Sequence, residues 1–310
     1  MQRAALRAAA AARPVPCRWF RGPVPLLAVT AADKEALLRL RRNTGLPFTQ
    51  CREALQRCAG DLEQAEAWLQ AEAQRRGWSR SGTLRSRRAR EGLVGLLRDG
   101  AAAVMVEVNC ETDFVARTPQ FQQLVERVVL GTMAQCRASP PRGDKYLLQE
   151  EELGQLRTSP GGELLSDHFA LAMGQLGEKL ALRRAAWLQV PEATGHIGAY
   201  AHGSLAAPGP VAMGTYGALV ACEVTEPALP APQLEALGKK VAQHVVGMAP
   251  TTLGSPEDQP QGEHEKRLLA QSFLLAPDMT LGQFLAAQGG LRVRDFLRFQ
   301  CGHEEEGEGQ

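Results

Sequence analysis

The chain has 310 residues, 44% of them hydrophobic, which is enough to bury the cores of about two domains. Its formal net charge is +1, but five arginines and no acid precede Asp33, and subtracting those five charges leaves about −4 for the remainder. This charge excludes a general nucleic-acid binder, and no apolar run reaches the roughly 20 residues of a membrane-spanning helix.

The seven cysteines are scattered along the chain and none belongs to a CxxC pair. This pattern predicts neither a disulfide scaffold nor a zinc site, and it is typical of a reducing compartment. The sequence also contains no GxxxxGK[ST], HExxH or GxSxG string. We therefore expect no metal and no cofactor, and we interpret the cysteines as small apolar residues.

Residues 1–32 have the composition of a mitochondrial transit peptide. The opening MQRAALRAAAAA is rich in alanine and free of acids, and Arg3 and Arg7 would lie on one face of a helix. A secretory signal needs a longer apolar stretch than the arginines allow. We expect import into the mitochondrial matrix; the alternative is a disordered basic tail.

Residues 33–77 predict a bundle of three helices that looks like a ubiquitin-associated-type domain. Apolar residues recur at helical spacing, and Thr49 and Asp61 are placed to cap the second and third helices. The loop after the first helix should expose Leu46 and Phe48 as a docking surface. The alternative is that Phe48 packs inward.

The rest of the chain predicts an α+β core with an internal repeat. Two alternating strands, at 93–97 and 103–108, flank a turn and precede an amphipathic helix after Pro119. The same order of two strands and a helix recurs about a hundred residues later, at 197–201, 218–224 and 234–245. The core should therefore consist of two related α+β halves with small antiparallel sheets. The expected segments are a basic linker (78–91), the N-terminal half of the core (92–190), the C-terminal half (191–302) and a disordered acidic tail (303–310).

Four further segments of the core should form secondary structure. Residues 164–188, which include LALRR at 180–184, predict a long helix, and residues 267–273 predict a short one. Two short elements are expected around 281–286 and 293–299.

The corner between the second strand and the helix differs between the two copies. The first copy has Thr112-Asp113-Phe114-Val115, whereas the second has Thr225-Glu226-Pro227-Ala228. A purely structural corner does not require an aromatic residue beside an acid, and an aromatic at such a turn is awkward to bury. This corner is our first candidate for a functional site.

Five stretches, in order along the chain, resemble elongation factor Ts. They are LRRNTGLPFTQCREAL, EVNCETDFVA, LGEKLALRR, YAHG and HVVGMAP. No long charged coiled-coil insertion separates the two halves. Together with the transit-like start, this indicates the mitochondrial branch of the family.

The resemblance implies a guanine-nucleotide exchange factor and not an enzyme. Such a protein binds mitochondrial elongation factor Tu in its GDP-bound and nucleotide-free forms and promotes GDP release, without direct nucleic-acid or membrane contact. Phe114 would wedge into the GTPase domain, Asp113 would disturb the groups that hold magnesium, and Gly177 and His202 would lie near the phosphate loop. The full set of implied contact residues is Leu46, Phe48, Thr112, Asp113, Phe114, Val115, Gly177 and His202.

Two rival hypotheses stay open at this point. Cys110 could act as a nucleophile with a distant histidine, but its acidic neighbours should raise the thiol pKa, which disfavours the thiolate. A non-catalytic ubiquitin-type adaptor could be built on the first helical bundle, but this hypothesis leaves the acid–aromatic corner unexplained.

Overall fold

The computed structural model describes residues 31–303 except residues 45, 85–86, 160, 204–208, 226–228 and 263. Nearly all of the expected transit peptide, the acidic tail after His303 and most of the second-copy corner lie outside these residues. Among the described residues, no helix combines the length and apolar character that a bilayer crossing requires.

Three helices form the expected N-terminal bundle. They are α1 (Ala31–Thr44), α2 (Phe48–Arg57) and α3 (Leu62–Leu84). Asp61 caps α3, because its Oδ1 accepts a hydrogen bond from the Gln64 amide at 3.0 Å. Thr49 does not cap α2, because that helix begins one residue earlier, directly after Pro47.

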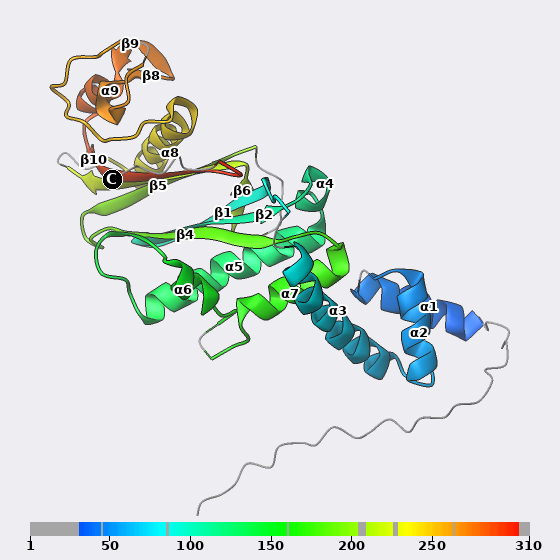
Figure 1. The fold of residues 1–310 in the computed structure, drawn as a ribbon. Helices are drawn as coiled ribbons and strands as arrows, with labels where there is room; N and C mark the ends of the chain where they lie inside the picture. Colours follow the sequence, from blue (N-terminus) through cyan, green and yellow to red (C-terminus); the bar gives the residue numbers. More distant parts are fainter. Residues whose placement is uncertain are drawn as a thin grey trace, which may run out of the picture.

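The third helix is longer than the sequence pattern predicts. It extends to Leu84, into the stretch that we expected to be a linker. A polar segment without proline can continue a helix that is already nucleated, and neither Gly77 nor Gly82 ends it. Helix α3 packs against α7 (Leu165–Leu176) of the core, where Gly174 allows close approach to the Ala73 carbonyl (Figure 1).

The first half of the core is a five-stranded antiparallel sheet with helices on its outer face. Its strands are β1 (Glu91–Asp99), β2 (Ala102–Cys110), β3 (Lys145–Leu147) and β4 (Ala181–Gln189), in the order β3-β4-β2-β1-β6. The fifth strand, β6 (Ala212–Gly214), comes from the second half and pairs with β1. The helices are α4 (Asp113–Ala116), α5 (Pro119–Ala138), α6 (Glu150–Gly154) and α7. The predicted hairpin and the helix after Pro119 are confirmed.

The long helix that we expected at 164–188 is wrong in its second part. Gly177 adopts φ 78° and ends α7, and residues 181–189 form β4, which pairs with β2. Residues 185–188 of this inner strand are apolar and buried on both faces, and periodicity alone does not distinguish such a short run from part of a buried helix.

The second half contains a three-stranded antiparallel sheet in the order β10-β7-β5. Its elements are β5 (Gly195–His202), β7 (Tyr216–Val224), α8 (Ala231–Met248), β8 (Ser272–Phe273), β9 (Ala276–Thr280), α9 (Leu281–Gln288) and β10 (Leu291–Gln300). The helix expected at 267–273 is a single 3₁₀ turn, Leu268–Ala270, that leads into β8, because this short apolar segment is buried beneath α9.

The two sheets stack face to face and share one core. Val94, Met105 and Leu188 of the first sheet pack against Ile197, Leu219 and Phe299 of the second. Helix α5 covers the outer face of the first sheet and α8 covers that of the second (Figure 1). The repeat of two strands and a helix is thereby confirmed, as is the α+β class.

Candidate functional site

The acid–aromatic corner lies where β2 ends and the one-turn helix α4 begins. Thr112 caps α4, because its Oγ1 accepts a hydrogen bond from the Val115 amide at 3.4 Å. Successive residues of α4 then point in opposite directions. Val115 is buried in the core of the first half, whereas Phe114 is 80% exposed. An aromatic side chain this exposed contributes little to folding, and it is available to a partner.

Asp113 is held only weakly by its own helix. Its carboxylate lies 3.1 Å from the Arg117 guanidinium, and both side chains are about half exposed or more. An exposed ion pair of this kind contributes about 0–1 kcal/mol, so a partner can displace Arg117 at small cost.

The corner and the turn that follows α7 are joined by hydrogen bonds to two carboxylates, one from each segment. Glu178 accepts hydrogen bonds from the Thr112 amide at 3.0 Å and from the Thr112 hydroxyl at 2.7 Å. In return, Glu111 accepts a hydrogen bond from the Lys179 amide at 2.7 Å. Gly177 supplies the left-handed turn that aims these residues at the corner.

The segment before β1 is tied to the same site. Arg87 donates a hydrogen bond to Glu111 at 3.2 Å, and the Lys179 ammonium donates one to the Arg87 carbonyl at 2.7 Å. The local sequence pattern indicates no role for Arg87, Glu111 or Glu178. Both acids lie within the motifs that carry the family resemblance, but only the fold brings the two motifs together.

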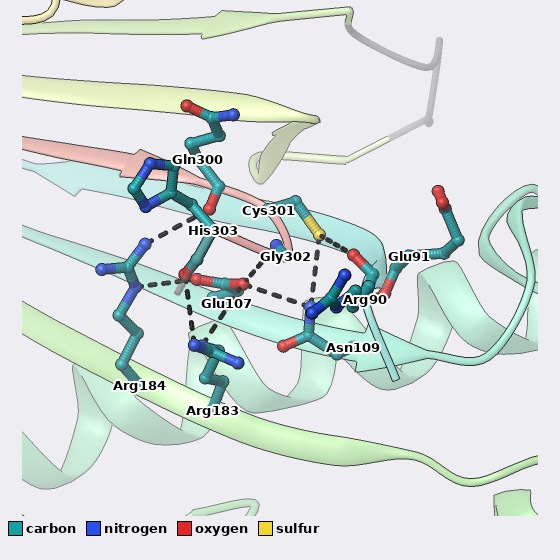
Figure 2. Close-up of polar contacts among 10 residues, drawn as sticks. All are labelled: Arg90, Glu91, Glu107, Asn109, Arg183, Arg184, Gln300, Cys301, Gly302 and His303. Atoms are coloured by element: carbon teal, nitrogen blue, oxygen red, sulfur yellow. Dashed lines mark hydrogen bonds and ion pairs between the residues drawn. The ribbon is translucent and has the colours of Figure 1, made fainter. Parts of the chain in front are cut away.

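A buried charge network holds the end of β2 just before the corner. Figure 2 shows the Glu107 carboxylate, which is fully buried, between Arg184 and the backbone amide of Gly302. Glu107 lies 2.7 Å from Arg184 Nε and accepts hydrogen bonds from Gly302 N at 2.8 Å and Asn109 Nδ2 at 3.1 Å. These contacts join β2 and β4 to the turn that follows β10, and they fix the strand from which the corner projects.

Cys110 is unsuited to nucleophilic catalysis. Burial, followed by the negative charges of Glu178 and Glu91, raises the pKa of its thiol to about 12. The thiol also donates a hydrogen bond to the Thr112 carbonyl at 3.1 Å. Within the described part of the chain, no group of three or more His, Cys, Asp or Glu residues could hold a metal ion.

His202 lies on a different surface, at the end of β5. It contacts the Tyr200 hydroxyl through Nδ1 at 3.2 Å and borders a groove of about 490 Å³. The groove is also lined by Tyr216 and Arg298 and by the exposed side chains of Leu274 and Leu275. None of the corner residues lines it. The structure therefore brings Gly177 to the corner but places His202 in a groove of its own.

The loop of the helical bundle corrects one expectation. Leu46 is 1% exposed and packs with Leu40 and Cys51, so it belongs to the bundle core and not to a docking surface. The loop turns its side chain inward, because the Thr44 hydroxyl accepts a hydrogen bond from the Leu46 amide at 3.4 Å. Phe48 is 37% exposed and lies beneath the Arg41 guanidinium, at 4.1 Å from the ring centre.

Comparisons with known proteins find relatives of a single family across most of the chain. A family model described as elongation factor Ts, mitochondrial, N-terminal, matches residues 26–79, and one described as elongation factor TS matches residues 111–267. Two proteins named elongation factor Ts, mitochondrial, from Rattus norvegicus and Homo sapiens, are each 48% identical to this chain over 288 residues. The aligned residues cover 91% of this chain and 87% of each relative. A protein of the same name from Nematostella vectensis is 38% identical over 290 residues, covering 87% of this chain and 99% of the relative.

Proposed function

This chain belongs to the elongation factor Ts family, mitochondrial branch, and we propose that it binds mitochondrial elongation factor Tu and accelerates the release of GDP from it. Membership makes the chain a translation elongation factor. The observation that carries the proposal is the corner at the end of β2. There a phenylalanine that is 80% exposed stands beside an acid on a braced single turn of helix.

Exchange by such a protein requires no bond chemistry. A factor that binds the nucleotide-free partner more tightly than the GDP-bound partner weakens GDP binding by the same factor, because the two equilibria are linked. A thousandfold loosening of GDP corresponds to about 4 kcal/mol of differential binding. The chain thus acts through protein–protein contacts in both the GDP-bound and the nucleotide-free complex, and not as an enzyme.

Phe114 and Asp113 have complementary parts in this mechanism. Phe114 enters an apolar slot of the GTPase domain, where burying its ring contributes about 1.5–3 kcal/mol. Asp113 leaves its weak pair with Arg117 and disturbs the groups that hold magnesium. A carboxylate placed there competes electrostatically with the phosphate for the cation.

The remaining contact residues extend the interface beyond the corner. Phe48 gives the helical bundle an exposed aromatic side chain, and the groove beside His202 gives the second half a surface with apolar and cationic side chains. Gly177 and Thr112 contribute to binding by fixing the backbone of the corner. The buried Val115 anchors α4 to the core of the first half. Binding at several surfaces of one partner adds affinity without new chemistry.

We also place the protein in the mitochondrial matrix. Its relatives are named mitochondrial, and residues 1–32 have a transit-peptide composition. Import into isolated mitochondria, followed by protection from added protease after the outer membrane is opened, tests this location. Protein that stays accessible to the protease would contradict it.

The test of exchange is GDP release from mitochondrial elongation factor Tu loaded with a fluorescent GDP. The wild-type chain should accelerate release, and Phe114→Ala should lose most of the acceleration. The matched control is Leu147→Ala, which removes another exposed apolar side chain, 46% exposed, from the edge strand β3. Binding of Tu without any acceleration by the wild-type chain would favour an adaptor and contradict the proposal.

A further inference from the structure

We infer that Glu178 is a positioning residue for nucleotide exchange: it holds the Thr112–Phe114 corner in the conformation that enters the partner. This inference rests on the proposed function. Glu178 does not lie on the corner itself but in the turn after α7, 66 positions along the chain from Thr112. Its carboxylate reaches back to bind both the amide and the hydroxyl of Thr112.

The corner needs external support because it has little of its own. Helix α4 has only four residues, which is too short to be stable without tertiary contacts. Phe114 is 80% exposed and Asp113 is paired only with an exposed arginine, so neither side chain anchors the backbone. The anchor on the core side is Val115, and the anchor on the other side is the pair of bonds to Glu178.

The bonds from Thr112 to Glu178 also determine the start of α4. Thr112 Oγ1 donates its proton to Glu178 and is thereby oriented to accept the Val115 amide as the helix cap. Glu111 and the Lys179 amide form the reciprocal bond, so each segment fixes the backbone of the other. Hydrogen bonds to a carboxylate are about twice as strong as neutral ones, which suits two segments that meet at the surface.

Loss of this support should change affinity and leave the release step intact. Without the Glu178 carboxylate, the corner samples several conformations, and only a fraction of the molecules can enter the partner. The apparent dissociation constant rises by the inverse of that fraction, whereas a molecule that has bound still presents the same Phe114 and Asp113. A competent fraction of one tenth raises the half-saturating concentration tenfold.

The experiment is a titration of GDP release against the concentration of the full chain. For Glu178→Gln we expect the half-saturating concentration to rise about tenfold, with the maximal release rate within a factor of two of wild type. The matched control is Glu192→Gln, which makes the same chemical change in an exposed turn between β4 and β5. An unchanged half-saturating concentration in Glu178→Gln, or a fall in the maximal rate alone, overturns the inference.

A double-mutant cycle with Phe114→Ala separates positioning from direct contact. If Glu178 acts by presenting the corner, then Glu178→Gln causes a smaller loss in Phe114→Ala than in wild type, because only Asp113 is left to be presented. Additive losses would mean that Glu178 contributes independently of Phe114, which overturns the positioning role. If Phe114→Ala by itself leaves exchange unchanged, the proposed function fails, and hydrogen exchange then decides only whether Glu178 holds the corner in place.

Amide hydrogen exchange provides that readout without the partner. The Thr112 amide should exchange at least tenfold faster in Glu178→Gln, whereas the Gln122 amide, which bonds to the Thr118 carbonyl in α5, should keep its rate. Glu111→Gln is the second variant, and it should accelerate exchange of the Lys179 amide in the same way. Unaltered protection of Thr112 in Glu178→Gln would contradict the inference whatever the exchange assay shows.

Discussion

Glu107 and Arg184 pair across β2 and β4 inside the protein, with 2.7 Å between Glu107 Oε2 and Arg184 Nε. Glu107 is fully buried, and the Arg184 guanidinium also lies 4.1 Å above the Phe299 ring. Breaking a buried pair by removing one partner costs about 3–5 kcal/mol, because the other charge is left uncompensated. Since Gly302 and Asn109 still bond Glu107, we expect Arg184→Ala to lower the free energy of unfolding by about 3 kcal/mol.

The neighbouring arginine is the control for this loss. Arg183 lies 4.0 Å from the same carboxylate but is about one third exposed, so Arg183→Ala should cost about 1 kcal/mol or less. Urea unfolding of both variants measures the difference. Equal losses of unfolding free energy in the two variants would show that the buried Arg184 contact stabilises the fold no more than the Arg183 contact does.

A buried histidine makes the stability of the second half dependent on pH. His244 is fully buried, and its burial lowers the pKa of the imidazole to about 4. Its Nδ1 accepts the Leu274 amide at 3.2 Å, and its Nε2 faces Gln271 Oε1 at 3.1 Å, so the neutral form fits the site. The folded state therefore disfavours the protonated imidazole.

The sign of the pH effect follows from this lowered pKa. Stability from neutral His244 is fully present above the unfolded pKa of about 6.5 and is lost as the pH falls toward 4. By pH 5 the loss should reach about 2 kcal/mol, measured as a fall in the urea midpoint from pH 7.5. This range lies above the protonation of Glu265, because hydrogen bonds from Arg267 hold the pKa of that carboxylate at about 2.

The variant His244→Asn tests the assignment. It should be less stable than wild type at pH 7.5, but its stability should fall less steeply between pH 7.5 and 5. His168 and His196, whose pKa values burial also lowers, remain in both proteins and cancel in the comparison. Parallel pH profiles for wild type and variant would exclude His244 as the source.

The sequence pattern predicted the local structure best where periodicity and turn chemistry agreed. The β1–β2 hairpin and α5 appear as expected, because alternation, a Gly100 turn and a Pro119 helix start all indicate the same elements. The pattern failed for β4, where the short apolar run AAWL after two arginines fits part of a buried helix as well as a buried inner strand. It also missed the inward turn of Leu46, which depends on a side-chain hydrogen bond within the loop.

At the functional site, too, the sequence predicts the features that depend on neighbouring residues and misses those that depend on tertiary contacts. A comparison of the two copies singles out Thr112 to Phe114, because only local residue types are needed for it. The support from Glu178 is invisible in the sequence, because it depends on the turn at Gly177 and on the packing that brings α7 beside the corner. Tertiary contacts at this separation require the folded topology.

The contact between α3 and α7 should be intolerant of a single added methyl group. A Cβ at residue 174 would lie 2.1 Å from the Ala73 carbonyl oxygen, so Gly174→Ala forces the helical bundle away from the core. Overpacking of this kind costs about 1–3 kcal/mol, although alanine is the better helix former. We expect amide protection in α3 to fall by at least tenfold while β1 and β2 keep theirs. Gly154→Ala, which meets no atom within 4 Å, is the control and should leave both unchanged.

Two residues at the loop of the helical bundle allow stability and binding to be tested separately. Leu46 is buried, so Leu46→Ala should lower the stability of the bundle by about 2–5 kcal/mol through the cavity that it leaves.

Phe48 is 37% exposed, so Phe48→Ala should cost less than about 1 kcal/mol of stability. If the bundle grips elongation factor Tu through this ring, the same variant should weaken Tu binding by about tenfold, which corresponds to about 1.4 kcal/mol. Thermal unfolding and a Tu titration of the two variants measure both quantities. A Phe48→Ala variant that binds Tu as tightly as wild type would mean that the interface lies on another face of the bundle, since Leu46 is not available to replace it.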